Sequence, residues 1–187
     1  VKPEHLFSDG QAEGKMARER SHYDEFIAYV DAEFHRLYQL LGDAGILENT
    51  WLVLTADHGE MFERGVIGHS TEVLPYPLTN IPLLIFPPGQ RERLDVYAPT
   101  SAVDVLPTML HVTGQTVPEW CEGQVLPPFG DGAGLEERMV FTQHLRRNAP
   151  GKPLGHGSYM LIQGDYKLAY YQGWPQQEGL GELVELY

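Results

Sequence analysis

The sequence predicts an α/β fold in which an α/β sheet unit is followed by a small antiparallel sheet near the C-terminus. An amphipathic helix pattern precedes two apolar strand patterns, Trp51–Thr55 and Ile81–Phe86, and this order is typical of α/β units. Aromatic and β-branched residues recur in shorter strand patterns after residue 138, which indicates an antiparallel sheet. We therefore expect an α/β domain at residues 1–125 and a small β subdomain at residues 126–187.

Composition limits the classes of function. With 187 residues, of which 42% are apolar, the chain is long enough to bury a globular core. A formal net charge of −13 argues against a nucleic-acid partner, because phosphate binding needs clustered lysine and arginine. The single cysteine, Cys121, excludes an internal disulfide and a cysteine-based zinc site. No apolar run reaches the roughly 18 residues that span a bilayer, so we expect no membrane segment in this chain, and the compartment stays open.

The first expected element is a helix from about His22 to Gly42. Ser21 is the predicted N-cap, and Gly42 or Gly45 is expected to end the helix. Residues 1–20 carry no apolar period and are expected to form an irregular surface segment. The helix should pack against the sheet through apolar residues at helical spacing, which are Ile27, Val30, Phe34, Leu37 and Leu41.

The strand Trp51–Thr55 is followed almost directly by an acid, an imidazole and a glycine, Asp57-His58-Gly59. Ligands of open α/β sheets bind outside the carboxyl ends of the strands, so side chains at this position face the usual binding crevice. A carboxylate oxygen and an imidazole nitrogen together suit a divalent cation. We therefore predict a metal site at Asp57 and His58, with a plain capping turn as the alternative.

Residues 61–80 show no clear period and contain several glycines and prolines, which favours a functional loop. His69 lies on this loop, within chain reach of Asp57. The strand that follows, Ile81–Phe86, ends at a Pro-Pro-Gly sequence, and its Pro82 has to lie where the ladder needs no donor.

The second half of the chain is expected to begin with a short strand at Val96–Pro99. A helix should follow at Ser101–Thr113, and Pro107 would break or kink it. Residues 115–137 are rich in glycine and proline and indicate a linker. The last expected elements are strands, at Met139–Leu145, Tyr159–Gln163, Lys167–Tyr171 and Leu183–Tyr187.

Short motifs follow one another in a set order along the chain. They are Tyr23-Asp24, Val30-Asp31, Thr55-Ala-Asp-His-Gly-Glu60, Gly68-His69, Ile81-Pro-Leu-Leu-Ile-Phe-Pro-Pro-Gly89, Ser101-Ala-Val-Asp-Val-Leu-Pro-Thr-Met-Leu110, Gly164-Asp-Tyr-Lys-Leu168 and Glu185-Leu-Tyr187. In this order and spacing they resemble the C-terminal half of a sulfatase of the alkaline-phosphatase-like superfamily. The resemblance covers nearly the whole chain and implies an alkaline-phosphatase-like α/β/α sheet.

The resemblance also implies roles for matching residues. Asp57 and His58 match the aspartate and the Asn/His that bind the active-site divalent metal, and His69 matches a position, often Lys or His, that contacts the transferred group. The implied metal is calcium for a sulfatase, and manganese or zinc for the phosphoryl-transfer branch. The family nucleophile, a Cys or Ser within a Cys/Ser-x-Pro-x-Arg motif, has no match, since Cys121 is followed by Glu-Gly-Gln-Val.

As a whole, the resemblance implies a metal-dependent hydrolase of sulfate esters that acts on a small molecule or a glycan. This chain would carry only the C-terminal part of the active site, and a missing N-terminal half would supply the nucleophile, so the isolated chain is expected to be inactive. Two alternatives stay open. One is a phosphodiesterase, phosphonate monoester hydrolase or phosphoglycerol transferase of the same superfamily, and the other is a noncatalytic fragment or interaction module.

Overall fold

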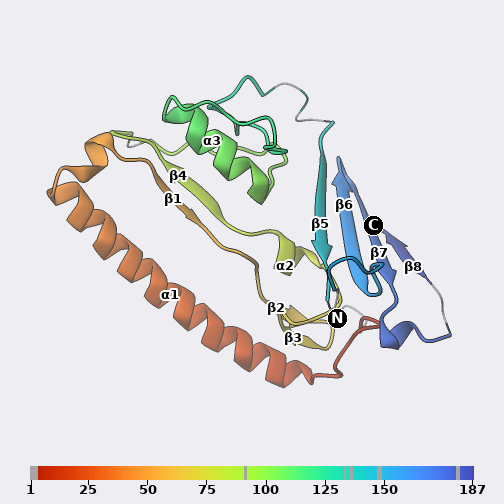
Figure 1. The fold of residues 1–187 in the computed structure, drawn as a ribbon. Coiled ribbons are helices and arrows are strands. Elements are labelled where there is room, and N and C mark those ends of the chain that lie inside the picture. Colours follow the sequence, from red (N-terminus) through yellow and green to blue (C-terminus); the bar gives the residue numbers. More distant parts are fainter. Residues whose placement is uncertain (1–3, 91, 133, 135–136, 147–148, 180–181) are drawn as a thin grey trace. The chain divides into compact units, whose positions relative to one another are not determined.

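The computed structural model describes residues 4–90, 92–132, 134, 137–146, 149–179 and 182–187 (Figure 1). The chain divides between Glu92 and Arg93 into two compact units, while the domain boundary expected at residue 125 stays a prediction. No helix in the described part combines the length and apolarity needed to cross a membrane.

The helices and strands of the first unit are α1 (Glu13–Asp43), β1 (Leu52–Thr55), β2 (Met61–Glu63), β3 (Val66–Gly68), α2 (Tyr76–Thr79) and β4 (Leu83–Phe86). Those of the second unit are α3 (Val105–Val112), β5 (Met139–His144), β6 (Gly157–Gln163), β7 (Tyr166–Gln172) and β8 (Leu183–Leu186).

Helix α1 begins well before its predicted start at His22. The prediction of Ser21 as N-cap is wrong, because Ser21 lies inside the helix and its hydroxyl donates to the carbonyl one turn earlier at 3.1 Å. The added segment is rich in Glu, Lys, Ala and Arg, which favour helix by propensity alone, but it shows no apolar period because only its Met16 is buried. The other end agrees with the prediction, since Gly45 adopts a left-handed φ of 71° just after the helix.

Aromatic side chains connect α1 to the strands of the first unit. Tyr23 lies against Phe62 of β2 with ring centroids 5.4 Å apart, and Phe34 and Tyr38 lie 5.6 and 5.4 Å from Phe86 of β4. The predicted apolar face is only partly covered, because a helix of 31 residues is about 46 Å long and a strand of four residues about 13 Å. The members of that face with about half of their surface exposed are Ile27, Val30 and Leu37.

Both strands predicted in the first half of the chain form, and they pair with each other. β1 and β4 run antiparallel, with Thr55 opposite Leu83. Pro82 precedes this first ladder pair, where no donor is needed, and its carbonyl accepts a hydrogen bond from the Thr55 hydroxyl at 2.8 Å. The end of β1, from which Asp57 follows, is therefore fixed beside the start of β4.

The segment predicted as a loop, residues 61–80, holds a β-hairpin and the short helix α2. β2 and β3 are antiparallel, with Met61 opposite Gly68 at the open end. The turn consists of Arg64 and Gly65, whose φ angles of 56° and 81° are both positive. Positive φ at both central positions is the mark of a type I′ turn, whose twist matches that of paired strands. Strands of only three residues are too short to show a period, which is why the pattern indicated a loop.

The segment before α1 packs against this turn, so the expectation of an irregular surface segment is only partly right; residues 1–3 lie outside the described part. The His5 N–H donates to the Arg64 carbonyl at 3.3 Å. His5 and Phe7 are 7% and 2% exposed, and their rings stack. A Cβ added at Gly65 would lie 2.0 Å from a serine hydroxyl of this segment, so the contact requires glycine at the turn.

The second unit begins with irregular chain, so the predicted strand at Val96–Pro99 is wrong. Tyr97 in this segment is 91% exposed, and none of the described strands pairs with it. The predicted helix forms as a 3-10 turn, Ala102–Asp104, followed by α3. Pro107 does not break α3, because it lies in the first turn, where a backbone N–H has no helical partner.

A buried carboxylate joins three segments of the second unit. Asp104 is fully buried and accepts hydrogen bonds from the backbone N–H groups of Ser101 at 2.7 Å and Gln124 at 2.9 Å. Arg138, directly before β5, donates two hydrogen bonds of 2.6 Å, one to each carboxylate oxygen. The start of the helical segment, the chain after it and the first strand of the sheet therefore meet at one charged group.

The expected linker, residues 115–137, contains no helix or strand among its described residues, but it is held against α3. The Leu126 N–H donates to the Thr108 hydroxyl at 2.8 Å, and these residues are 3% and 0% exposed. A Cβ added at Gly123 would lie 2.1 Å from the carbonyl oxygen of Val103. The segment is therefore part of the packed unit and not a free connection.

The C-terminal strands form the predicted antiparallel sheet, in the order β5-β6-β7-β8. β6 and β7 are joined at Gly164 and Asp165, as expected, and Gly164 has a φ of 53°. One face of the sheet is buried around Met160 and Tyr171, which are 1% and 3% exposed. The indole N–H of Trp174, just after β7, donates back to a β6 hydroxyl at 2.9 Å and holds the chain over this face.

Replacing Arg138 by methionine should destabilise the protein, because the Asp104 carboxylate would remain buried without its cation. We expect the free energy of unfolding to fall by about 3–5 kcal/mol, measured by urea denaturation. Arg93→Met is the matched control, since Arg93 is paired with Asp95 at the surface and its side chain is 84% exposed. Similar urea midpoints for the two variants would contradict the central role of the buried pair.

Candidate metal and substrate site

Asp57 follows the end of β1 and presents its carboxylate to solvent. The side chain is 89% exposed, and Oδ1 accepts the backbone N–H of His58 at 3.0 Å. This hydrogen bond directs the second oxygen, Oδ2, to within 3.7 Å of the His58 ring nitrogen Nε2. The residues predicted as metal ligands therefore place one oxygen and one nitrogen near each other.

A backbone carbonyl determines which nitrogen of His58 is available to a ligand. Nδ1 lies 2.9 Å from the carbonyl oxygen of Gly59. Because a carbonyl only accepts hydrogen bonds, Nδ1 is the donor and the lone pair of the neutral ring is on Nε2. Metal-binding histidines usually have their other ring nitrogen fixed by an outer hydrogen bond of this kind.

Gly59 allows the chain to pass close to helix α2. Its N–H donates to the Leu78 carbonyl at 2.9 Å, and a Cβ at this position would lie 1.9 Å from the carbonyl oxygen of Pro77. Glycine at this position is compatible with a sharp turn of the chain. The structure shows that a close approach of two backbones is the reason for glycine.

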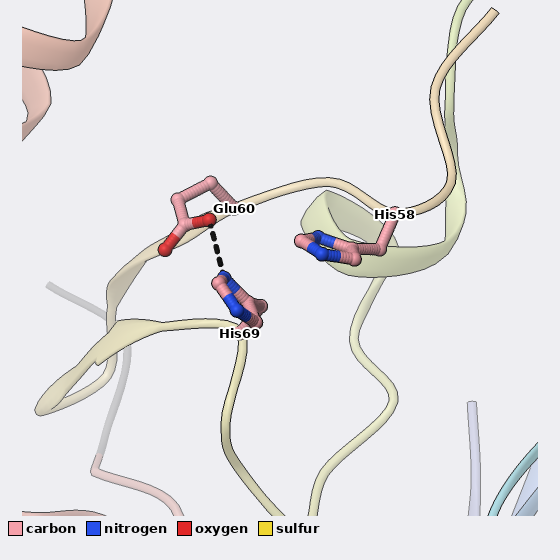
Figure 2. A group of neighbouring side chains, drawn as sticks. All are labelled: His58, Glu60 and His69. Atoms are coloured by element: carbon pink, nitrogen blue, oxygen red, sulfur yellow. Dashed lines mark hydrogen bonds and ion pairs between the residues drawn. The ribbon is translucent and has the colours of Figure 1, made fainter.

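The β2–β3 hairpin brings His69 back to His58. Glu60 directly precedes β2 and His69 directly follows β3, so the two residues flank the open end of the hairpin. His69 Nδ1 lies 2.9 Å from Glu60 Oε2, and the rings of His69 and His58 have centroids 4.1 Å apart (Figure 2). The predicted substrate residue thus lies beside one of the two predicted metal ligands.

Glu60 belongs to this group, but the sequence did not indicate a role for it. Its side chain is 19% exposed, compared with 50% for His69. The sequence feature that could have identified it is its position relative to the turn. Glu60 and His69 are the next residues outward from the paired Met61 and Gly68. Only the recognition of Arg64 and Gly65 as a hairpin turn would have revealed the pair.

The donors present fit a divalent cation. Asp57 Oδ2 and His58 Nε2 are 3.7 Å apart, whereas neighbouring ligand atoms around a divalent cation are about 3–3.5 Å apart at bond lengths of about 2.1–2.5 Å. A small rotation of the exposed Asp57 side chain closes this difference. A second set is formed by His58, Glu60 and His69, whose candidate ligand atoms all lie within 4.8 Å of one another.

Comparison with known proteins gives matches over most of the chain. A family model described as Sulfatase matches residues 3–115. Arylsulfatase K of Bos taurus is 28% identical over 158 residues, which cover 82% of this chain and 29% of the bovine protein. The multifunctional alkaline phosphatase superfamily protein PehA of Trinickia caryophylli is 30% identical over 123 residues, which cover 63% of this chain and 23% of that protein. The chain thus spans less than a third of the length of these curated relatives.

Solved structures share the fold. The phosphonate monoester hydrolase of Silicibacter pomeroyi matches with a TM-score of 0.67 at 24% identity, covering 84% of this chain and 32% of that chain. A protein described in complex with its substrate D-glucosamine-2-N,6-O-disulfate matches with a TM-score of 0.61 at 23% identity, covering 86% of this chain and 32% of that chain. These matches confirm the predicted fold class.

Replacing Gly59 by alanine should destabilise the protein, because the added Cβ would overlap the Pro77 carbonyl oxygen. We expect a loss of about 1–3 kcal/mol in the free energy of unfolding, measured by urea denaturation. Gly14→Ala, within α1, is the matched control: nothing lies within 4 Å of its added Cβ, and alanine should stabilise the helix by roughly 0.5–1 kcal/mol. A Gly59 variant as stable as the Gly14 variant would show that the two backbones do not approach this closely.

Proposed function

This chain belongs to the sulfatase family, and from that premise we propose that the protein hydrolyses sulfate esters with a divalent cation in its active site. Family membership implies the cation. The observation that supports the proposal best is the grouping after β1, where Asp57, His58 and His69 lie within the matched segment. The two imidazole rings are 4.1 Å apart, and an aspartate oxygen lies 3.7 Å from one of them.

Asp57 and His58 are the proposed ligands of the cation. His58 would bind through Nε2, because its Nδ1 is held by the Gly59 carbonyl. Calcium is the proposed ion, since it takes six or more oxygen ligands and Asp57 supplies a hard carboxylate, with further ligands from elsewhere in the protein. When bound, the cation would neutralise charge on the oxygens of the transferred group.

His69 is the proposed contact to the sulfuryl group. Glu60 holds Nδ1, so Nε2 is the ring nitrogen that remains for the substrate. A protonated ring donates a hydrogen bond from Nε2 to a sulfuryl oxygen and stabilises negative charge there. A neutral ring would instead accept a proton at the same atom.

The nucleophile is proposed to come from another part of a longer protein. The 187 residues contain no Cys/Ser-x-Pro-x-Arg motif. The only cysteine, Cys121, is followed by Glu-Gly-Gln-Val and therefore does not match the motif. Ester hydrolysis of this kind needs a nucleophile in line with the leaving oxygen. Asp57, His58 and His69 would therefore orient the sulfate ester and stabilise its negative charge. The substrate would be either a small aryl sulfate or a sulfated glycan.

A second candidate is hydrolysis of a phosphate diester or a phosphonate monoester in the same site. The specific observation in its favour is the set His58, Glu60 and His69, because two imidazoles and one carboxylate suit manganese or zinc better than calcium. Rates of the complete protein on 4-nitrophenyl sulfate, bis-4-nitrophenyl phosphate and 4-nitrophenyl phenylphosphonate separate the candidates. The sulfate ester should be the preferred substrate.

Asp57→Ala should remove both the bound metal and the activity of the complete protein, because a carboxylate ligand is lost. Metal content is measured by elemental analysis and turnover with 4-nitrophenyl sulfate. The control is Asp24→Ala, an exposed aspartate on α1, which should change neither quantity. A variant at Asp57 with full metal content and normal turnover would disprove the assignment.

His69→Ala should lower the catalytic rate by roughly two to three powers of ten, the scale for deleting one transition-state donor, and leave the metal content unchanged. Steady-state kinetics and elemental analysis test this in the complete protein. His35→Ala, an exposed histidine on α1, is the control. Loss of metal in the His69 variant would make His69 a ligand, and unchanged kinetics would leave it without a role.

A further inference from the structure

We propose that Glu60 is a positioning residue, which fixes the orientation and the protonated nitrogen of His69 so that Nε2 faces the substrate. The proposal rests on the role of His69 proposed above and extends it to Glu60, which the proposed sulfate-ester site does not use as a ligand. It is carried by the hydrogen bond of 2.9 Å between His69 Nδ1 and Glu60 Oε2. A carboxylate only accepts hydrogen bonds, so Nδ1 carries the proton.

The backbone of the hairpin holds the two partners opposite each other. The register of β2 and β3 places Glu60 and His69 one step beyond the pair of Met61 and Gly68. Directly opposite residues of an antiparallel pair have Cβ atoms about 4.5–5.5 Å apart, which is within reach of a carboxylate and an imidazole. The contact is therefore set by the fold and not by a chance approach of two flexible side chains.

The Glu60 carboxylate lies beside Gly68 of β3. A Cβ added at Gly68 would lie 3.4 Å from Glu60 Oε1, and the φ of Gly68 is 101°, which L side chains rarely adopt. The carboxylate thus lies next to β3, and only 19% of the Glu60 side chain is exposed. Restricted in this way, Glu60 can hold the ring of a more exposed histidine in one orientation.

His58 restrains the same ring from its face. The ring planes of His58 and His69 are inclined by 33° with centroids 4.1 Å apart, while Glu60 binds the edge of the His69 ring (Figure 2). One contact limits the tilt of the ring and the other limits its rotation. Nε2 is the polar atom of His69 that neither contact uses.

The experiment measures the tautomer of His69 and the steady-state kinetics in three forms of the complete protein. These are the wild type, Glu60→Ala and Glu60→Gln. Nitrogen-15 NMR at about pH 8.5, well above the ordinary histidine pKa, reports which ring nitrogen carries the proton. In the wild type the proton should be on Nδ1. Glu60→Ala should lose this preference, whereas Glu60→Gln should keep it, because the amide oxygen still accepts a hydrogen bond.

The kinetic arm uses the same variants. Glu60→Ala should lower kcat by about ten- to a hundredfold, the scale for removing a residue that orients a functional histidine, with metal content unchanged. Glu60→Gln should recover part of this loss. Glu25→Ala, an exposed glutamate on α1, is the control and should behave as wild type in both arms.

The outcomes separate this proposal from the proposed function. An unchanged His69 tautomer in Glu60→Ala, or loss of the bound metal in that variant, would overturn the positioning role. If the wild type turns over no sulfate ester but Glu60→Ala still shifts the proton from Nδ1, the proposed substrate is wrong and the control of His69 by Glu60 stands. Equal kcat values for wild type and Glu60→Ala on an active protein would also overturn the proposal.

Discussion

The register of the β2–β3 hairpin is the constraint on which the candidate site depends. A type I′ turn at Arg64 and Gly65 sets which residues face each other, and a slip by one residue would send His69 to the other face of the strand. The N-terminal segment supports the turn from outside, because it packs where a side chain at Gly65 would otherwise lie. The position of an imidazole beside β1 is therefore determined by the geometry of a hairpin whose Met61 and Val66 are each 1% exposed.

The second unit is organised by a different kind of interaction. Burying a carboxylate costs several kcal/mol unless its oxygens are satisfied, and Asp104 meets this condition with two backbone donors and the guanidinium of Arg138. Each of these donors comes from a different segment. The ion pair thus fixes where the segments meet, while the apolar residues around Leu126 and Met160 supply the burial.

The sequence predicted the elements whose apolar, aromatic or β-branched residues follow a recognisable helix or strand pattern. β1, β4, α3 and the C-terminal sheet were readable for this reason, and so was the position of Asp57 and His58 at a strand end. The start of α1 was not predicted, because its residues favour a helix by propensity but show no apolar periodicity. Glu60 with His69, and Asp104 with Arg138, were missed because each pair becomes adjacent only through the fold: the first pair is nine positions apart in the sequence and the second 34.

The candidate site residues of this chain all lie within one short segment, from Asp57 to His69, and this has a consequence for when the site can form. A hairpin closes within about 1–10 μs, whereas a ribosome adds about 5–20 residues per second. The arrangement of Glu60 and His69 has therefore ample time to form as soon as the segment emerges during synthesis. Segments that are distant in sequence then have to dock onto a hairpin in which the two partners already face each other.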